Sequence, residues 1–185
     1  MSIADVVCGV VSGTVLASTI NAIKNLAESA SSTYWFVTNS TNAAIAHVGG
    51  AGDTYLTNNA LGSDTSAYNP NSKTVLWDPS ANKFVFTSLK IGDIVTVTGV
   101  VLFDNLAAQE VDMFISMSEG TASAHEHKIN HSYYKTAGTD TEITFSYDIF
   151  MHDADALAGG ARIRFESVQA ASITVDIWSA KVVIV

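Results

Sequence analysis

The sequence of 185 residues contains one cysteine, two prolines and only nine basic side chains. A lone Cys8 can neither close an intrachain disulfide nor supply a thiolate metal cluster, so the fold must be stabilised by core burial or self-association. Nine Lys and Arg residues against eighteen Asp and Glu residues give a formal net charge of −9. That is the wrong sign for a protein that neutralises phosphates, so nucleic acid and anionic membranes are excluded as partners.

Uninterrupted hydrophobic runs and catalytic signatures are also missing. Residues 6–23 are apolar but lack the basic start of a secretory signal, and small polar residues break them too often for a membrane-spanning helix. We therefore expect the start of the chain to be retained. No nucleophile elbow, P-loop or dinucleotide fingerprint is present, so no enzyme activity and no cofactor are expected. With 48% hydrophobic and 15% charged residues, the composition is that of a packed globule.

An amphipathic helix is expected over residues 15–30, before a polar cluster at 29–33. Its apolar positions are spaced by four, three and four residues, which places them in one narrow stripe. So short a helix must pack either on its own chain or on the same helix of neighbouring subunits, and both alternatives stay open. On the second alternative the stripe is an oligomer interface, made by Leu16, Ile20, Ile23 and Ala27.

From residue 33 onward the apolar period changes to two, which is the period of half-buried strands. The clearest alternation predicts five amphipathic strands, at residues 92–103, 111–117, 143–151, 163–165 and 173–177. Turn-rich segments separate them, no second helix is expected, and Gly99 is a candidate β-bulge. We predict a mainly β protein: an antiparallel β-sandwich of the jelly-roll type (33–185), preceded by an N-terminal anchor segment and short α-helix (1–32).

Two further segments carry specific expectations. Residues 34–37 and 43–48 are short apolar runs around a polar turn, which predicts a β-hairpin. The segment from Trp178 to Val185 is apolar on both faces of a strand, which indicates burial on both sides. Its cover is either the other sheet of the same chain or another subunit.

Three features occur together: the helix from Leu16 to Leu26, the run from Phe84 to Val97 and the closing strand from Ile173 to Val185. Together they resemble the jelly-roll domains of tailed-bacteriophage virion proteins, a group that includes head-decoration proteins, head fibres and tail-fibre modules. The resemblance implies a structural protein on the virion surface, such as a capsid decoration or fibre protein. It further implies a homotrimer whose N-terminal segment attaches to a phage capsid or tail protein.

Two histidine-containing clusters are candidate ion sites. His125 and His127 stand two apart, so on a strand both imidazoles share one face, as a metal site requires. This is similar to the cupin pattern, but the family's third ligand is absent from residues 128–131, and exposed edge-strand histidines are the plainer interpretation. His152, Asp153 and Asp155 could bind calcium through oxygen, or could simply connect the strands that end at Met151 and begin at Ala161.

Aromatic side chains near predicted turns could form a stacking platform for sugars, which makes a carbohydrate-binding module the alternative function and a host-surface glycan a further partner. The candidates are Tyr55, Tyr68, Trp77, Tyr133 and Tyr134. Glu110 and Asp112 share a strand face, and adjacent acids of this kind are more typical of a solvated surface than of a glycosidase pair.

Overall fold

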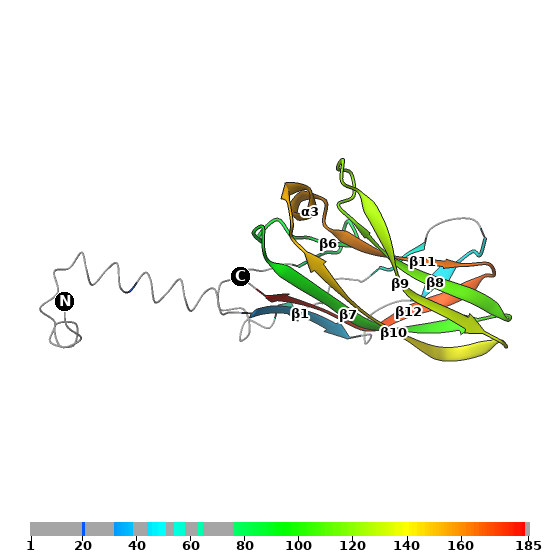
Figure 1. Ribbon diagram of the computed structural model, residues 1–185. Coiled ribbons are helices and arrows are strands. Elements are labelled where there is room, and N and C mark those ends of the chain that lie inside the picture. The colour runs from blue at the N-terminus through cyan, green and yellow to red at the C-terminus, as the bar shows by residue number, and fades with distance from the viewer. Residues whose placement is uncertain are drawn as a thin grey trace, which may run out of the picture.

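The computed structural model describes Ile20 and residues 32–38, 44–50, 54–57, 63–64 and 76–183. For residues 32–38, 63–64 and 139–140 it describes the backbone alone. The strands in these ranges form two antiparallel sheets that pack face to face, so the expected antiparallel sandwich is confirmed (Figure 1). No helix in the described ranges is long and apolar enough to cross a membrane.

Each sheet contains six strands. Sheet A has the order β10-β7-β12-β1-β4, with β2 also on β12, and sheet B has the order β5-β6-β11-β8-β9, with β3 also on β11. The strands of sheet A are β1 (Ser32–Thr38), β2 (Ile45–His47), β4 (Ser63–Asp64), β7 (Ile94–Asn105), β10 (Gly138–Phe150) and β12 (Ala171–Val183). Those of sheet B are β3 (Thr54–Tyr55), β5 (Trp77–Asp78), β6 (Lys83–Phe84), β8 (Gln109–Met117), β9 (His125–Tyr134) and β11 (Ala161–Ser167).

The strand pairs are nested along the chain. β8 pairs with β9, β7 with β10 outside them, β3 with β11 outside those, and β1 with β12 outermost. Four antiparallel pairs nested in this way behave as one long hairpin, and β7 on β12 and β8 on β11 roll it into two sheets. This pairing is that of a jelly roll.

The sandwich has two different ends. β12 begins at Ala171, opposite His47, and finishes at Val183, opposite Ser32. A strand of 13 residues spans roughly 40 Å, so the two chain ends of the sandwich lie together, far from the turn that precedes β12. We call the end with Ser32 and Val183 the terminus end, and the end with the turns β7–β8, β9–β10 and β11–β12 the loop end (Figure 1).

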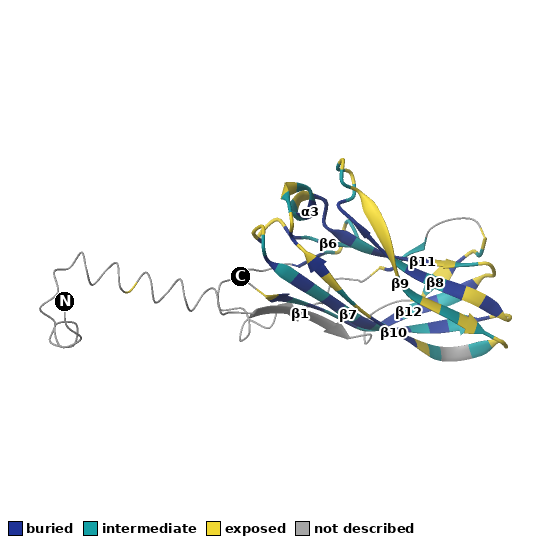
Figure 2. Cartoon of the chain, viewed as in Figure 1, coloured by how far each residue is buried: buried dark blue, intermediate teal, exposed yellow. Residues whose placement is uncertain are grey.

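The core between the sheets contains two groups of aromatic rings. One joins Trp178 to Trp77, Phe84 and Phe145, with centroid distances of 4.9, 5.1 and 6.4 Å. The other, nearer the loop end, joins Phe103 to Phe165 at 5.1 Å and to Tyr134 at 5.4 Å. Burial alternates along β7 and β8 as expected of strands with one face in the core (Figure 2).

The expected hairpin between residues 34–37 and 43–48 is wrong, although both strands exist. β1 and β2 do not pair with each other but lie end to end along the same long partner, β12. The register places Thr38 opposite Ile177 and Ile45 opposite Ile173. Both apolar runs thus pair with one strand and not with each other.

The expected bulge at Gly99 is also wrong. Gly99 keeps continuous register with Phe145 on one side and Trp178 on the other. Its missing side chain makes room for the Phe145 ring, which would lie 2.7 Å from an added Cβ. The irregularity lies in β12, between Val175 and Ile177.

The shift in β12 changes which side chains of the last strand face the core. Trp178, Ala180 and Val182 are fully buried, while Ile177 is only half-buried and Val183 is 37% exposed. Burial on both faces is therefore wrong for Val183, and Ile184 and Val185 lie outside the described residues.

A short helix, α3 (Ala154–Gly159), contradicts the expectation of no helix after the first. The Asp153 side chain accepts a hydrogen bond from the Ala156 amide at 2.8 Å and so caps its N-terminus. Gly160 follows with a φ of 64°, and a Cβ there would lie 2.2 Å from the Phe84 carbonyl oxygen, so the chain turn needs glycine. The expected N-terminal helix lies outside the described residues except for Ile20, which is 55% exposed.

Candidate functional site

The loop end carries several strongly exposed large apolar side chains. Its turns are short: residues 106–108, 135–137 and 168–170 each join two strands and are exposed throughout. Leu106 is 76% exposed and Val168 is 66% exposed. Val48, which directly follows β2, is 79% exposed. Large apolar side chains so exposed at one end of a molecule mark a candidate contact surface.

Buried amide side chains fasten these turns to each other. Asn105, at the inward-facing end of β7, is 3% exposed and donates hydrogen bonds to the carbonyl oxygens of Ala107 (2.7 Å) and Thr136 (2.8 Å). Gln109, at the start of β8, is 4% exposed and accepts from the Gln169 amide at 2.9 Å. Each amide therefore satisfies turn backbone that the strand ladders leave unpaired.

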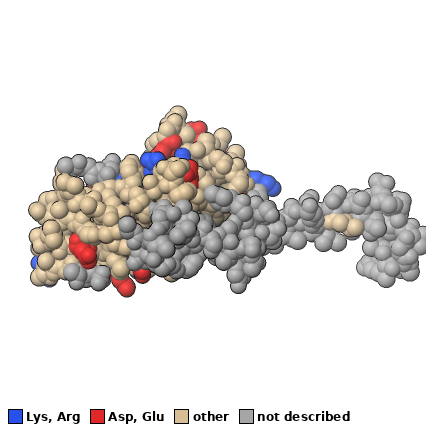
Figure 3. Space-filling view, turned by 180° about the vertical axis from the view of Figure 1, so that it is seen from behind, with Lys and Arg blue, Asp and Glu red and all other residues tan. Residues whose placement is uncertain are grey.

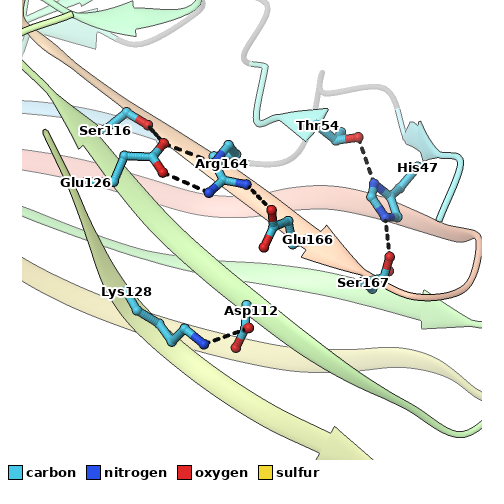
Figure 4. Close-up of polar contacts among 9 residues, drawn as sticks. All are labelled: His47, Thr54, Asp112, Ser116, Glu126, Lys128, Arg164, Glu166 and Ser167. Atoms are coloured by element: carbon cyan, nitrogen blue, oxygen red, sulfur yellow. Dashed lines mark hydrogen bonds and ion pairs between the residues drawn. The ribbon is translucent and has the colours of Figure 1, made fainter. Parts of the chain in front are cut away.

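His47 ties the start of the chain to the same end. Its ring is 3% exposed and meets Phe165 edge-on at 5.5 Å. Nε2 lies 3.3 Å from the Ser167 carbonyl and Nδ1 2.7 Å from the Thr54 hydroxyl (Figure 4). Because a carbonyl only accepts, Nε2 donates and, in the neutral ring, Nδ1 accepts from Thr54. Gly49 then packs directly on the backbone of Gln169, where an added Cβ would clash at 2.3 Å.

The loop end is thus a surface of ordered turns. It presents aliphatic and small side chains together with Lys135 and Gln169 on turns held by buried hydrogen bonds, and most of the described surface seen from behind is tan, with a few charged groups toward this end, at the left (Figure 3). No nucleophile, general base or anion clamp is assembled among the turn residues listed above. Such a surface suits contact with another molecule and not catalysis.

Ion pairs link the strands on the outer face of sheet B. Arg164, 5% exposed, pairs with Glu126 through Nε (3.0 Å) and Nη2 (2.8 Å), and with Glu166 at 2.6 Å (Figure 4). The guanidinium also stacks over the Phe114 ring at 4.2 Å. Hydrogen bonds from Arg164 lower the pKa of Glu126; burial opposes that shift, and a further hydrogen bond from Ser116 adds to it.

The acids considered for glycoside hydrolysis belong to the same face. Asp112 accepts from Lys128 Nζ at 2.7 Å and lies 2.6 Å from His131 Nδ1, so its carboxylate is already paired. Glu110 is exposed. Both acids lie on the outer face of sheet B, where Glu166 is opposite Asp112 in the neighbouring strand, and the solvated-surface interpretation fits them.

The histidine pairs lie where the sequence placed them, but no ion site is assembled from described residues. The rings of His125 and His127 share one face of the edge strand β9, with centroids 5.3 Å apart, and both are exposed. Asp153 caps α3 and Asp155 accepts from Ser123, so both carboxylates have other partners. Within the described part of the chain, no group of three His, Cys, Asp or Glu side chains could hold a metal ion.

The described members of the possible aromatic platform lie in different surroundings. Trp77 is 2% exposed in the core, Tyr134 packs on Phe103, and Tyr55 stacks under Arg162 at 5.1 Å. Tyr133 is 59% exposed. Tyr68 lies outside the described residues, as do Cys8 and the interface candidates Leu16, Ile23 and Ala27.

Sequence reasoning missed His47, Asn105 and Gln109 as the residues that organise the loop end. The signal was present for two of them. Asn105 and Gln109 occupy inward positions of the alternating pattern, where an apolar residue is the rule, and they stand on either side of a three-residue turn. A polar side chain at such a position needs a buried partner, and turn carbonyls and amides are the nearest ones.

Comparisons with known proteins give fold likenesses only. No protein-family model matches the chain, and no curated protein does. Solved structures that resemble it include infectious bursal disease virus, Gx strain, with 11% identity, a TM-score of 0.48, and 82% of this chain aligned with 32% of that one. The VP2 subviral particle of the same virus has 9% identity and a TM-score of 0.47, with 82% and 32% covered. Eiger TNF from S. frugiperda has 6% identity and a TM-score of 0.39, with 82% and 90% covered.

The chain spans about a third of the length of the viral proteins that it resembles. Likenesses at this level of identity and superposition assign neither a family nor a function to it.

Proposed function

We propose that this protein is a structural component of a virus particle: a trimeric capsid-decoration or fibre protein on the surface of a tailed bacteriophage. On this proposal it is not an enzyme and needs no cofactor. Residues 1–32 attach it to a capsid or tail protein, and the jelly roll projects from that attachment.

The observation that carries the proposal is the polarity of the sandwich. The N-terminal segment enters at Ser32, beside Val183, while the ordered apolar turns lie at the far end of the 13-residue strand β12. A module held at its terminus end therefore presents its loop end away from the attachment point, which is the geometry of a surface projection. A net charge of −9 agrees with contacts to protein and not to packaged nucleic acid.

The resemblance of the segments Leu16–Leu26, Phe84–Val97 and Ile173–Val185 to phage virion proteins supplies the narrower parts of the proposal, namely the phage, the trimer and the anchor. The apolar stripe of Leu16, Ile20, Ile23 and Ala27 gives the trimer a specific seam, because its spacing of about 3.5 residues suits helices related by symmetry.

Particle association is tested with antibodies raised against the full-length protein and gold-labelled on purified particles from the source culture. We expect label on the outside of intact particles, and its absence from washed particles would overturn the virion assignment. A variant lacking residues 1–12 should fold, judged by an unchanged circular dichroism spectrum, yet fail to bind particles; normal binding would reject the anchor.

The trimer is tested by sedimentation velocity on the full-length chain. We expect a species of three times 19.6 kDa, and monomers for the double variant Ile20→Asp, Ile23→Asp. The matched control is Ser18→Asp, Asn25→Asp, which adds the same charge off the stripe. An unchanged oligomer in the first variant would reject the seam, and a monomeric wild type would reject the trimer.

A further inference from the structure

The outer face of sheet A ends in a row of apolar side chains at the terminus end. Phe150 is opposite Ile94, and Ile94 is opposite Val183, so the three residues lie side by side on β10, β7 and β12. Phe150 is 54% exposed, Val183 is 37% exposed and Ile94 is half-buried. The residue beside each of them in its strand is buried in the core: Ile149, Val95 and Val182. We call Phe150, Ile94 and Val183 the outer row.

The outer row differs from the rows next to it on the same face. The next row toward the loop end contains Asp148, Thr96 and Lys181, and the Thr96 hydroxyl donates to Asp148 at 2.6 Å. The row after that includes Thr98 and Ser179, whose hydroxyl oxygens lie 2.7 Å apart. Polar side chains of this kind are typical of a sheet face in contact with water. The general composition of these strands therefore does not explain three apolar residues in the last row.

Ile91 extends the apolar surface beyond the end of β10. Its side chain is 61% exposed, and it directly precedes Gly92, whose amide donates to the Met151 carbonyl at 2.8 Å. That hydrogen bond holds the turn with Ile91 against the chain that follows Phe150. Large exposed apolar side chains gathered at one place on a surface mark a contact with another molecule.

The entry point of the chain indicates which molecule that is. Ser32, where the sandwich begins, is opposite Val183, so the N-terminal segment enters beside the outer row. Ala27, the last residue of the apolar stripe, precedes Ser32 by five residues, so no more than about 18 Å of chain separates them. Copies joined along this stripe hold the terminus ends of their sandwiches at an effective concentration on the order of millimolar. Even a small apolar contact between such copies is then populated.

The other candidate to cover the outer row is the helix expected over residues 15–30 of the same chain. A helix that lies on a sheet needs an apolar face at least about 100° wide. The spacing of about 3.5 residues from Leu16 to Ala27 predicts a narrower stripe, which suits a seam between helices related by symmetry. Copies with a net charge of −9 also repel each other, so their contact needs a surface without acids, and the three side chains of the outer row are uncharged.

We infer that the outer row, together with Ile91, packs against a second copy of this chain, sandwich against sandwich, beside the helical seam. The inference rests on the proposed trimer and names the part of the jelly roll that contributes to it. Removal of Phe150 and its neighbours from water adds to the stability that the stripe provides.

Side-chain labelling by hydroxyl radicals, measured by mass spectrometry on the full-length protein, tests whether the row is covered. Phe150 and Ile91 should be labelled several-fold more slowly in wild-type trimers than in the double variant Ile20→Asp, Ile23→Asp. Leu106, at the loop end, should be labelled equally in both. Equal labelling of Phe150 would overturn the inference and leave the trimer intact. Slow labelling of Phe150 in both proteins would also overturn it, because the chain would then cover its own row.

A variant of the row tests its contribution to association. Phe150→Asp changes a half-exposed side chain, so the protein should fold, and the concentration at which trimers dissociate in sedimentation velocity should rise about tenfold or more. Leu106→Asp adds the same charge at the loop end, is the matched control and should associate as wild type. Circular dichroism checks that both are folded, and Phe150→Ser replaces a variant that is not.

Equal association by Phe150→Asp and Leu106→Asp would overturn the role of the outer row while the trimer stands. A wild-type protein that sediments as a monomer would instead reject the trimer and the inference with it. Gold labelling of particles reports on the virion assignment separately from either result.

Discussion

The two ends of this sandwich differ in how the chain covers the core between the sheets. Toward the terminus end, the long connection before β7 supplies Trp77 and Phe84, whose rings pack against Trp178. At the loop end, three-residue turns are too short to cover anything, and the chain instead buries His47, Asn105 and Gln109 beneath them. The difference teaches that short turns over a core need inward polar side chains, because these side chains make the hydrogen bonds that the turn backbone would otherwise lack.

The largest expected effect is in the aromatic group around Trp178. Trp178→Ala removes the ring that contacts Trp77, Phe84 and Phe145, and should lower the free energy of unfolding by about 4 kcal/mol. Urea denaturation measures it, with Trp178→Phe as a milder variant if the alanine protein does not fold. A loss below that of Val168→Ala, at an exposed position, would contradict the packing described for Trp178.

The next effect tests the buried amides. Asn105→Ala leaves the carbonyl oxygens of Ala107 and Thr136 without their donor and should cost about 2 kcal/mol. Hydrogen exchange should accelerate in the turns at 106–108 and 135–137 and remain unchanged around Trp178.

The matched control for that variant is Asn130→Ala, because Asn130 also donates to a backbone carbonyl, that of Thr144, but at an exposed site. We expect it to cost well under half as much. Equal losses in the two variants would show that burial of Asn105 is not what matters.

A smaller, pH-dependent effect distinguishes the Glu126–Arg164 ion pair from the neutral hydrogen bonds of Asn105. Because Arg164 lowers the pKa of Glu126 in the folded protein, this carboxylate stabilises the fold above its unfolded pKa, and the contribution is lost as pH falls through the lowered folded value. The Glu126 side chain is 41% exposed, so screening keeps the contribution below about 1 kcal/mol.

The measurement compares wild type with Glu126→Gln by urea denaturation at a series of pH values. The difference in unfolding free energy should be constant above about pH 4.5 and shrink at lower pH, whereas the loss in Asn105→Ala should not change over that range, since amides do not ionise. A difference for Glu126→Gln that persists unchanged at low pH would contradict the pairing with Arg164.

The smallest effect is expected at the exposed apolar turns. Leu106→Ser should change the free energy of unfolding by no more than about 0.5 kcal/mol, because its side chain is 76% exposed. If it instead destabilised the protein as much as Asn105→Ala, the turn would be part of the core, and the distinction between displayed and buried residues at the loop end would fail.

Much of the fold could be predicted from alternation alone. The strands over residues 94–105, 109–117, 138–150 and 161–167 overlap the periodic segments closely. Alternation did not predict β9, because residues 125–134 are exposed or half-buried along their whole length. Only the spacing of its histidines pointed to a strand there. α3 was missed because six residues are too few for a helical period, although Asp153 and Gly160 are typical cap residues.

The sites were less predictable than the strands. The rings of His127 and Tyr147 lie close together because β9 and β10 are the end strands of their sheets. No local sequence pattern encodes that arrangement. The role of Arg164 was equally hidden, since it occupies an outward position in the alternation and yet is 5% exposed, enclosed by Glu126, Glu166 and the Phe114 ring.

The sequence by itself determined that this chain forms strands with one apolar face, since a period of two leaves no other way to bury residues such as Val95, Val97 and Val101. Only the tertiary structure decided which strands are neighbours. That choice aligned β1 and β2 along β12, placed the bulge in β12 instead of at Gly99, and gave Asn105 and Ser118 their surroundings. The reason is physical: periodicity fixes which face of a strand is buried, whereas partners and register depend on contacts between residues far apart in the chain.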